Sequence, residues 1–80
     1  MGSREIIRNY IVRMLMQNSK YNLGDNDKLI SGGLIDSFAL VELSLFLEEQ
    51  FGISVDETDL NAKNMDTVQL IADYVETRRK

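Results

Sequence analysis

The stretch Gly33-Leu34-Ile35-Asp36-Ser37-Phe38 places a serine hydroxyl at the point where a glycine-containing loop gives way to a helix. The residues that follow, 39–51, are rich in leucine and glutamate and contain neither glycine nor proline. Asp and Ser are favoured N-caps, and glycine often follows the last turn of a helix, as Gly52 does here. These signals predict a helix over residues 37–51, around which the rest of the chain is arranged.

Ser37 lacks the neighbours of a catalytic serine. An alcohol nucleophile normally needs a general base beside it, and the chain contains no histidine and no cysteine. A lysine or carboxylate base would then be required, and no motif links Lys20, Lys28 or Lys63 to Ser37. The sequence therefore favours a serine that another enzyme modifies over a small hydrolase.

The composition predicts one small folded domain over residues 1–80. Single cores usually need about 50 residues or more, and this chain has 80, of which 44% are hydrophobic and 28% charged. The formal net charge of −4 disfavours nucleic acid as a partner, because phosphates require a basic surface, and favours a partner rich in Lys and Arg. The opening Met1-Gly2-Ser3 is compatible with a cloning remnant.

The sequence also predicts where the protein is found. No apolar run approaches the roughly 20 residues that span a bilayer, and no signal-peptide segment opens the chain. The lack of cysteine fits a reducing compartment. We therefore expect a cytoplasmic protein without membrane insertion.

A first helix and a long loop precede the central helix. Residues 4–17 carry an apolar stripe at helical spacing, which indicates a helix. In residues 18–36 the periodicity fails and Asn, Asp, Ser and Gly accumulate, which predicts a loop. Four apolar residues are expected to pin this loop to the domain: Leu23, Leu29, Ile30 and Leu34.

Two more helices are predicted after the central one. Asp56 is expected to cap a short helix over residues 57–60. Asp66 and Gln69 match a capping box that opens a last helix over residues 67–78. The predicted fold class is therefore all-α, a small four-helix bundle of three main helices and one short helix, with the long loop between the first two.

The central helix carries two apolar arcs. The first is assigned to the core and comprises Leu40, Leu43, Leu47 and Phe51. The second comprises Phe38, Val41 and Leu45, and it is bordered by Glu42, Glu48 and Glu49. A helix face built only for stability is mostly polar, so we expect the second arc to bind a partner. An ordinary solvated face is the alternative reading of the glutamates.

Several motifs together resemble an acyl carrier protein. They are Gly33-Leu34-Ile35-Asp36-Ser37-Phe38, Val41-Glu42-Leu43, Leu47-Glu48-Glu49-Gln50-Phe51-Gly52-Ile53 and Asp66-Thr67-Val68. The resemblance implies a four-helix domain in which Ser37 carries 4′-phosphopantetheine through a phosphodiester, with a terminal thiol that holds cargo as a thioester. It also implies that Asp36 is recognised by the phosphopantetheinyl transferase and helps to hold the Mg²⁺ that accompanies coenzyme A in that enzyme. We expect no metal site in the chain itself.

The resemblance implies a non-catalytic, monomeric carrier. Its expected partners are the phosphopantetheinyl transferase and ligases, synthases and transferases with basic docking surfaces. The expected cargo is an acyl intermediate of fatty-acid-like or secondary-metabolite biosynthesis. Aminoacyl cargo, of the peptidyl or D-alanyl type, is the alternative, because Phe38 replaces a usual leucine and Gly32-Gly33-Leu34-Ile35 resembles the approach to the serine in free-standing carriers of amino acids. Ala39 and Gln50 replace acidic residues that are frequent in fatty-acid carriers, so housekeeping fatty-acid synthesis is not the expected pathway.

Three other interpretations concern single features. The protein would be a helical adaptor if Ser37 were a phosphorylation site or a plain cap. The cluster Asp25-Asn26-Asp27 is read as a solvated loop, because Leu29 stands where an EF-hand needs an oxygen ligand. Cargo could enter between the helices along a lining that includes Met14, Leu43, Leu47, Met65 and Ile71, and a dry core is the equal alternative.

Overall fold

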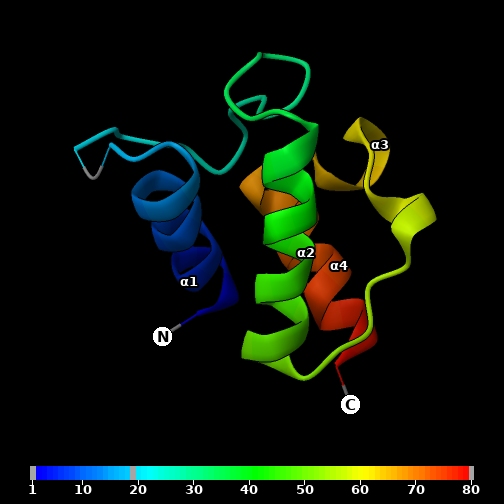
Figure 1. The fold of residues 1–80 in the computed structure, drawn as a ribbon. Coiled ribbons are helices and arrows are strands. Elements are labelled where there is room, and N and C mark those ends of the chain that lie inside the picture. The colour runs from blue at the N-terminus through cyan, green and yellow to red at the C-terminus, as the bar shows by residue number, and fades with distance from the viewer. Residues whose placement is uncertain (1, 19, 80) are drawn as a thin grey trace.

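The fold is all-α, as the sequence predicts. The computed structural model describes residues 2–18 and 20–79, so Met1 of the predicted cloning remnant lies outside the described residues. The elements are α1 (Ser3–Tyr10), a π-helical segment (Ile11–Leu15), α2 (Ser37–Phe51), a 3₁₀ turn (Glu57–Asp59), α3 (Ala62–Met65) and α4 (Val68–Arg78). Within the described ranges no residue lies in a strand. Figure 1 shows α2 in front at the centre, with α1 on its left, α3 on its right and α4 passing behind it. Helices α1 and α4 pack directly against each other.

The first helix does not continue as an α-helix to residue 17. After Tyr10 the backbone forms a π-helical turn, in which the amide of Met16 donates to the carbonyl of Ile11 at 2.8 Å. A π-helix closes i→i+5 bonds, so each residue advances through a smaller angle than in an α-helix. Met14 is thereby carried out of the apolar stripe and is 61% exposed. The prediction that Met14 belongs to an internal lining is therefore wrong.

The central helix α2 begins and ends at capping residues. The side chain of Asp36 accepts a 2.8 Å hydrogen bond from the amide of Ala39, which fixes the N-terminus. At the other end Gly52 has φ 66°, a left-handed conformation that glycine adopts without the penalty of a Cβ. Local chemistry alone therefore defines the span of this helix.

The segment before α4 differs from the prediction. Asp56 caps the chain by accepting from the amide of Thr58, but the turn that follows is 3₁₀ and a separate short helix, α3, comes after it. The predicted capping box is wrong, because Thr67 is the N-cap of α4 and accepts from the amide of Leu70 at 3.0 Å. Asp66 instead points into the protein, where its carboxylate accepts hydrogen bonds from the long loop.

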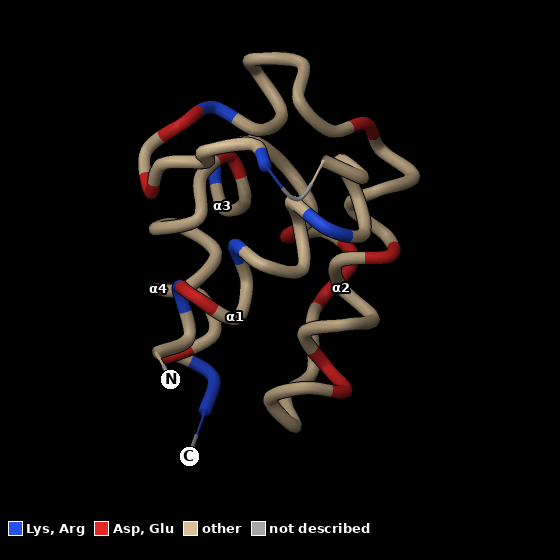
Figure 2. Tube along the Cα trace, turned by 90° about the vertical axis from the view of Figure 1, so that its left-hand side faces the viewer, with Lys and Arg blue, Asp and Glu red and all other residues tan. Residues whose placement is uncertain are grey.

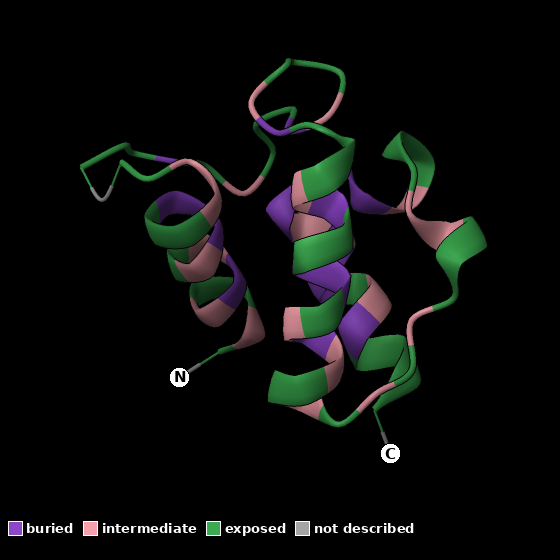
Figure 3. Cartoon of the chain, viewed as in Figure 1, coloured by how far each residue is buried: buried purple, intermediate pink, exposed green. Residues whose placement is uncertain are grey.

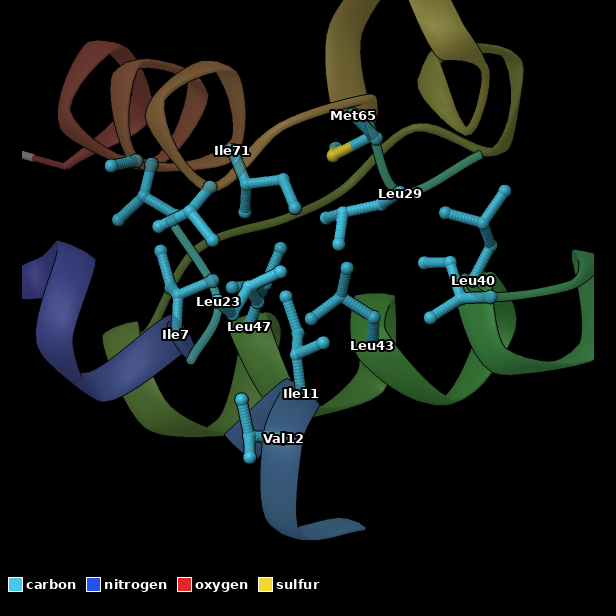
Figure 4. Packing of buried hydrophobic residues seen from close by; sticks show 14 residues of the cluster. Ile7, Ile11, Val12, Leu23, Leu29, Leu40, Leu43, Leu47, Met65 and Ile71 are labelled. Carbon is cyan, nitrogen blue, oxygen red and sulfur yellow. The ribbon is translucent and has the colours of Figure 1, made fainter. Parts of the chain in front are cut away.

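The core lies between α1, α2 and α4 and is closed by the loop and by Met65 of α3 (Figure 4). Three side chains of the first arc of α2, those of Leu40, Leu43 and Leu47, are buried, whereas Phe51 is half-buried. The loop contributes buried Leu23, Leu29 and Ile35, while Ile30 and Leu34 are half-buried. The complete set of buried hydrophobic residues is Ile7, Ile11, Val12, Leu23, Leu29, Ile35, Leu40, Leu43, Leu47, Met65, Val68, Ile71, Ala72 and Val75. Each fully buried aliphatic side chain of this size contributes roughly 1.5–3 kcal/mol of transfer free energy.

Aromatic contacts join α2 to its neighbours. The rings of Tyr10 and Phe46 stack with centroids 3.9 Å apart and planes 11° from parallel, which holds α1 against α2. At the far end of α2, the guanidinium of Arg79 lies 5.7 Å from the ring centre of Phe51. In the part of the chain that is described, no helix is both long and apolar enough to cross a membrane.

Candidate attachment site and docking surface

Ser37 is the first residue of α2 and is exposed. The residues around it are anchored, since Ile35 and Leu40 are both buried in the core. Asp36 is exposed as well, and its carboxylate is engaged with the amide of Ala39. The structure therefore presents the serine hydroxyl to solvent from a fixed piece of backbone.

The start of α2 suits a phosphate group. The Asp36 side chain and carbonyl accept from the amides of Ala39 and Leu40, at 2.8 and 3.2 Å. The amides of Ser37 and Phe38 precede these bonds, and the first N–H groups of a helix have no intrahelical acceptor. Together with the positive end of the helix dipole they form a favourable anion site, worth about 0.3–1 kcal/mol for the dipole alone at an exposed position. A phosphodiester on the Ser37 hydroxyl fits these groups.

A shallow pocket adjoins Ser37. It has a volume of about 220 Å³ and is lined by Ser37, Leu40, Val41, Glu57 and Leu60. Sequence reasoning did not assign Glu57 or Leu60 to the site, because no periodic pattern places the segment after α2 beside its start. The pocket offers apolar wall and one carboxylate next to the hydroxyl.

The second apolar arc of α2 faces outward (Figure 3). Phe38, Val41 and Leu45 are 80%, 52% and 59% exposed, which is unusual for large apolar side chains on one helix. Glu42 and Glu49 are also exposed, and α2 contains no Lys or Arg (Figure 2). We call Phe38, Val41, Leu45, Glu42 and Glu49 the α2 surface.

Glu48 differs from the other two glutamates of α2. It is half-buried, and its carboxylate accepts a 2.9 Å hydrogen bond from the amide of Val55. This bond ties the chain after Gly52 back to the helix. Among the described residues, the Glu48 carboxylate therefore has a hydrogen bond within the protein that the carboxylates of Glu42 and Glu49 lack.

Asp25 is part of an ion-pair network rather than a solvated loop. Its carboxylate pairs with Arg4 at 3.2 Å and also with Arg8, and its carbonyl accepts from the amide of Gln69 at 3.0 Å. The sequence interpretation of this cluster is wrong for Asp25, because its partners come from α1 and α4. Within residues 2–18 and 20–79 no group of three or more His, Cys, Asp or Glu residues is arranged to hold a metal ion.

Two other hollows lie away from Ser37. A groove of about 300 Å³ between α1 and α2 is lined by residues that include Tyr10, Met14 and Phe46. The larger hollow, of about 740 Å³, lies where α2 and α4 end and includes Phe51, Ser54 and Arg78. Neither contains Ser37, so size alone does not identify the site of modification.

An exposed serine at the start of a central helix, beside an apolar surface with an acidic border, describes a carrier domain. The comparison with known families gives the same result, since residues 5–75 match the family described as phosphopantetheine attachment site, and the chain belongs to this family. It is a carrier protein of the acyl carrier type, and the family bears covalently attached 4′-phosphopantetheine. Carrier domains of this kind are generally non-catalytic and interact with a phosphopantetheinyl transferase and acyl-handling enzymes.

Proposed function

We propose that Ser37 is the attachment point and that the protein carries acyl groups as thioesters between partner enzymes. The observation that supports this most directly is the exposed Ser37 at the first position of α2, inside the region that matches the family. The prosthetic arm supplies the thiol that forms the thioester, since the chain contains no cysteine. The chain's own residues position the arm and bind the partner enzymes.

The modification is a group transfer from coenzyme A. The Ser37 oxygen forms a bond to the phosphorus that bears pantetheine, and the pyrophosphate bond of coenzyme A breaks, which releases adenosine 3′,5′-bisphosphate. The hydroxyl proton passes to a base that the transferase provides. Asp36, exposed beside the serine, is the proposed recognition residue and an added oxygen ligand for the enzyme's Mg²⁺.

The α2 surface is the proposed docking site for these enzymes. Its acidic residues would pair with Lys and Arg of a partner, and exposed pairs of this kind contribute only about 0–1 kcal/mol each. Their main effect is on encounter rate and orientation, which suits a carrier that must leave each enzyme after a turnover. Phe38, Val41 and Leu45 add a short-range apolar contact. Glu48 is also proposed to contact partners, but to contribute less to docking than Glu42 and Glu49, because its carboxylate accepts a hydrogen bond from the Val55 amide.

Aminoacyl cargo is the alternative to acyl cargo. It is favoured by the Gly32-Gly33-Leu34-Ile35 approach to the serine, while Ala39 and Gln50 make α2 less acidic than in typical fatty-acid carriers. The proposed pathway for acyl cargo is fatty-acid-like or secondary-metabolite biosynthesis, and cytoplasmic location and a monomeric state stay predictions. Loading the holo-protein with an acyl ligase and, separately, with an aminoacyl-adenylating enzyme would separate the two cargo classes.

The attachment is tested by mass spectrometry. The purified protein is incubated with coenzyme A, Mg²⁺ and a broad-specificity phosphopantetheinyl transferase, and intact mass and peptide mapping follow. We expect one phosphopantetheine on Ser37, none on Ser37→Ala, and normal loading of Ser54→Ala, a matched variant at another exposed serine. A wild-type chain that gains no mass would refute the proposal and favour the helical adaptor. A gain at another residue would refute Ser37 as the attachment point.

A further inference from the structure

Asp66 binds the long loop through both its backbone and its side chain. Its carbonyl accepts from the amide of Leu29 at 2.6 Å. Its carboxylate accepts from the amides of Ile30 and Ser31 at 2.8 and 2.9 Å, and from the Ser31 hydroxyl at 2.7 Å. Asp66 is only 7% exposed, and its three carboxylate bonds are partly buried. We call Asp66 with these four bonds the Asp66 clamp.

The clamp is connected to Ser37 by a compact turn. The carbonyl of Leu29 accepts from the amides of Leu34 and Ile35, at 2.8 and 3.0 Å. Gly33 has φ 75°, a conformation that other residues rarely adopt, and a Cβ on Gly32 would lie 2.3 Å from the carbonyl oxygen of Lys28. The loop therefore folds back on Leu29 and delivers Ile35 directly to Asp36, the cap of α2.

Among its described residues the long loop forms no helix or strand that would fix its position, so the Asp66 clamp holds it in place. Residues 28–35 lie in no helix or strand, and the described backbone hydrogen bonds that their amides donate run to the carbonyls of Leu29, Ile30 and Asp66. Leu29 and Ile35 are buried, so the loop cannot shift without exposing apolar surface or breaking charge-assisted bonds. The position of the Asp36-Ser37 pair thus depends on a residue at the α3–α4 junction.

We propose that Asp66 is a positioning residue for the modification of Ser37, and this inference rests on the proposed function of Ser37. A transferase that recognises the loop and the start of α2 together binds the fraction of molecules in which the loop is closed. If that fraction falls, the apparent affinity falls with it, while the rate of the bound complex is unchanged. Loss of the clamp therefore raises KM for the carrier and leaves kcat in place.

Steady-state loading kinetics with coenzyme A and a broad-specificity transferase test this proposal. Asp66→Ala removes three bonds to the carboxylate, and we expect KM for the carrier to rise about tenfold with kcat within about twofold. Asp66→Asn keeps one oxygen for the two amides, and its NH₂ can donate to the Ser31 hydroxyl, so KM is expected within about threefold of wild type. All variants are assayed where circular dichroism shows the native helical signal.

Two variants of α4 serve as controls. Asp73→Ala removes an exposed carboxylate from the same helix, and Val75→Ala lowers stability through a cavity in the core. Both are expected to load with wild-type KM. Equal KM values for Asp66→Ala and Val75→Ala would overturn the proposal, since they would show that Asp66 acts only through global stability.

Ser31→Ala decides the matter if Asp66→Ala does not fold. It removes one bond of the clamp, and we expect KM to rise about twofold to threefold. Relative to wild type, amide exchange should become faster at Leu34 and Ile35 and change less at Leu47. Unchanged KM and unchanged exchange would overturn the inference. A wild-type chain that is not loaded would instead refute the function proposed for Ser37, so the two failures are distinguishable.

Discussion

The hydroxyl of Tyr74 in α4 donates a 2.7 Å hydrogen bond to the carboxylate of Asp59, at the end of the 3₁₀ turn. Arg78 donates to the same carboxylate oxygen at 2.9 Å, and its guanidinium lies 4.5 Å from the centre of the Tyr74 ring. Glu57, in the same turn, lines the pocket beside Ser37. The hydrogen bond between Tyr74 and Asp59 therefore ties the 3₁₀ turn, which forms one wall of the pocket beside Ser37, to α4.

Replacing Tyr74 by Phe should destabilise the protein by about 1 kcal/mol, the usual net value of a hydrogen bond. The change removes the 2.7 Å bond to Asp59 and a long 3.4 Å bond that the hydroxyl accepts from the amide of Asp56. Burial, followed by the hydrogen bond to Asp59, raises the pKa of Tyr74 above its ordinary value. Because the folded-state pKa is raised, this contribution is present below the unfolded pKa of about 10 and is lost as pH rises through the folded value. Urea unfolding at pH 7 and at alkaline pH measures both effects.

Tyr10→Phe is the matched control for Tyr74→Phe. The Tyr10 hydroxyl donates only a long 3.4 Å bond to the carbonyl of Glu42, and its ring stack on Phe46 survives the change. We expect a smaller loss of unfolding free energy than for Tyr74→Phe. Equal losses would contradict the role given to the Asp59 bond.

Acid should weaken the fold partly through Asp66. Burial raises the pKa of the Asp66 carboxyl, but the hydrogen bonds from Ser31 and Ile30, with the positive charge of Lys28, together outweigh burial, so the pKa lies below its ordinary value. A group with a depressed folded-state pKa stabilises the protein above its unfolded pKa of about 3.9 and loses that contribution as pH falls through the folded value. Melting temperatures of wild type and Asp66→Asn should therefore converge as pH is lowered from 7 to 3.

A residual acid dependence is expected in Asp66→Asn. The backbone hydrogen bond from Thr58, followed by the bond from its side chain, lowers the pKa of Asp56. Protonation of Asp56 in acid therefore also lowers the stability of the fold. A difference between wild type and Asp66→Asn that stays constant down to pH 3 would show that Asp66 ionisation does not contribute to stability.

Neutralising the acidic border of α2 should slow partner association. Glu42→Gln and Glu49→Gln each remove an exposed charge, and we expect the association rate with a basic-surfaced transferase to fall about twofold to fivefold at low salt. The difference should shrink as salt is raised, because exposed charges are screened. Stopped-flow or biosensor kinetics across ionic strength measure this effect.

Glu5→Gln is the control for these charge changes. Glu5 is exposed on α1 and carries the same charge at a site outside the α2 surface. Its association rate should stay within experimental scatter of wild type. A loss as large as that of Glu49→Gln would indicate that net charge, and not the α2 surface, governs association.

Phe38→Ala should weaken partner binding without weakening the fold. The side chain is 80% exposed, so its removal leaves no cavity and is expected to change unfolding free energy by about 0.5 kcal/mol or less. Leu43→Ala, on the buried side of the same helix, should cost about 2–5 kcal/mol. Affinity for the transferase and urea unfolding of both variants test the assignment of the two arcs. Unchanged affinity in Phe38→Ala would remove that residue from the docking surface.

Short-range signals explain what the sequence predicted. The span of α2 follows from Asp36 and Gly52, because both caps act within one turn of the helix. The division of α2 into a buried and an exposed arc follows from periodicity, and burial of Leu43 and Leu47 against exposure of Phe38 agrees with it. The family resemblance rests on motifs within and around α2 and on Asp66-Thr67-Val68, and the family match confirms it.

Long-range contacts explain what the sequence did not predict. Asp66 lies next to a second competent cap, Thr67, and only the distant loop amides show which of the two turns inward. The ion pairs of Asp25 do not follow from its local sequence, because its arginine partners belong to α1. The π-helical turn displaced Met14, and the four-residue helix α3 is too short to show periodicity. The roles of Ser37 and of the α2 surface stay predictions.

The direction of α2 has a practical consequence for handling the protein. A helix of 15 residues is about 22 Å long, and Figure 1 shows the start of α1 and the end of α4 on the side towards which α2 runs from Ser37. Gly52 and Arg79 line the same hollow, so the end of α4 lies near the end of α2. An affinity tag, a fluorophore or a bead attached beyond α1 or α4 would leave the Ser37 end of α2 facing away from the support. Ser37 of the immobilised protein should therefore remain accessible to enzymes in solution.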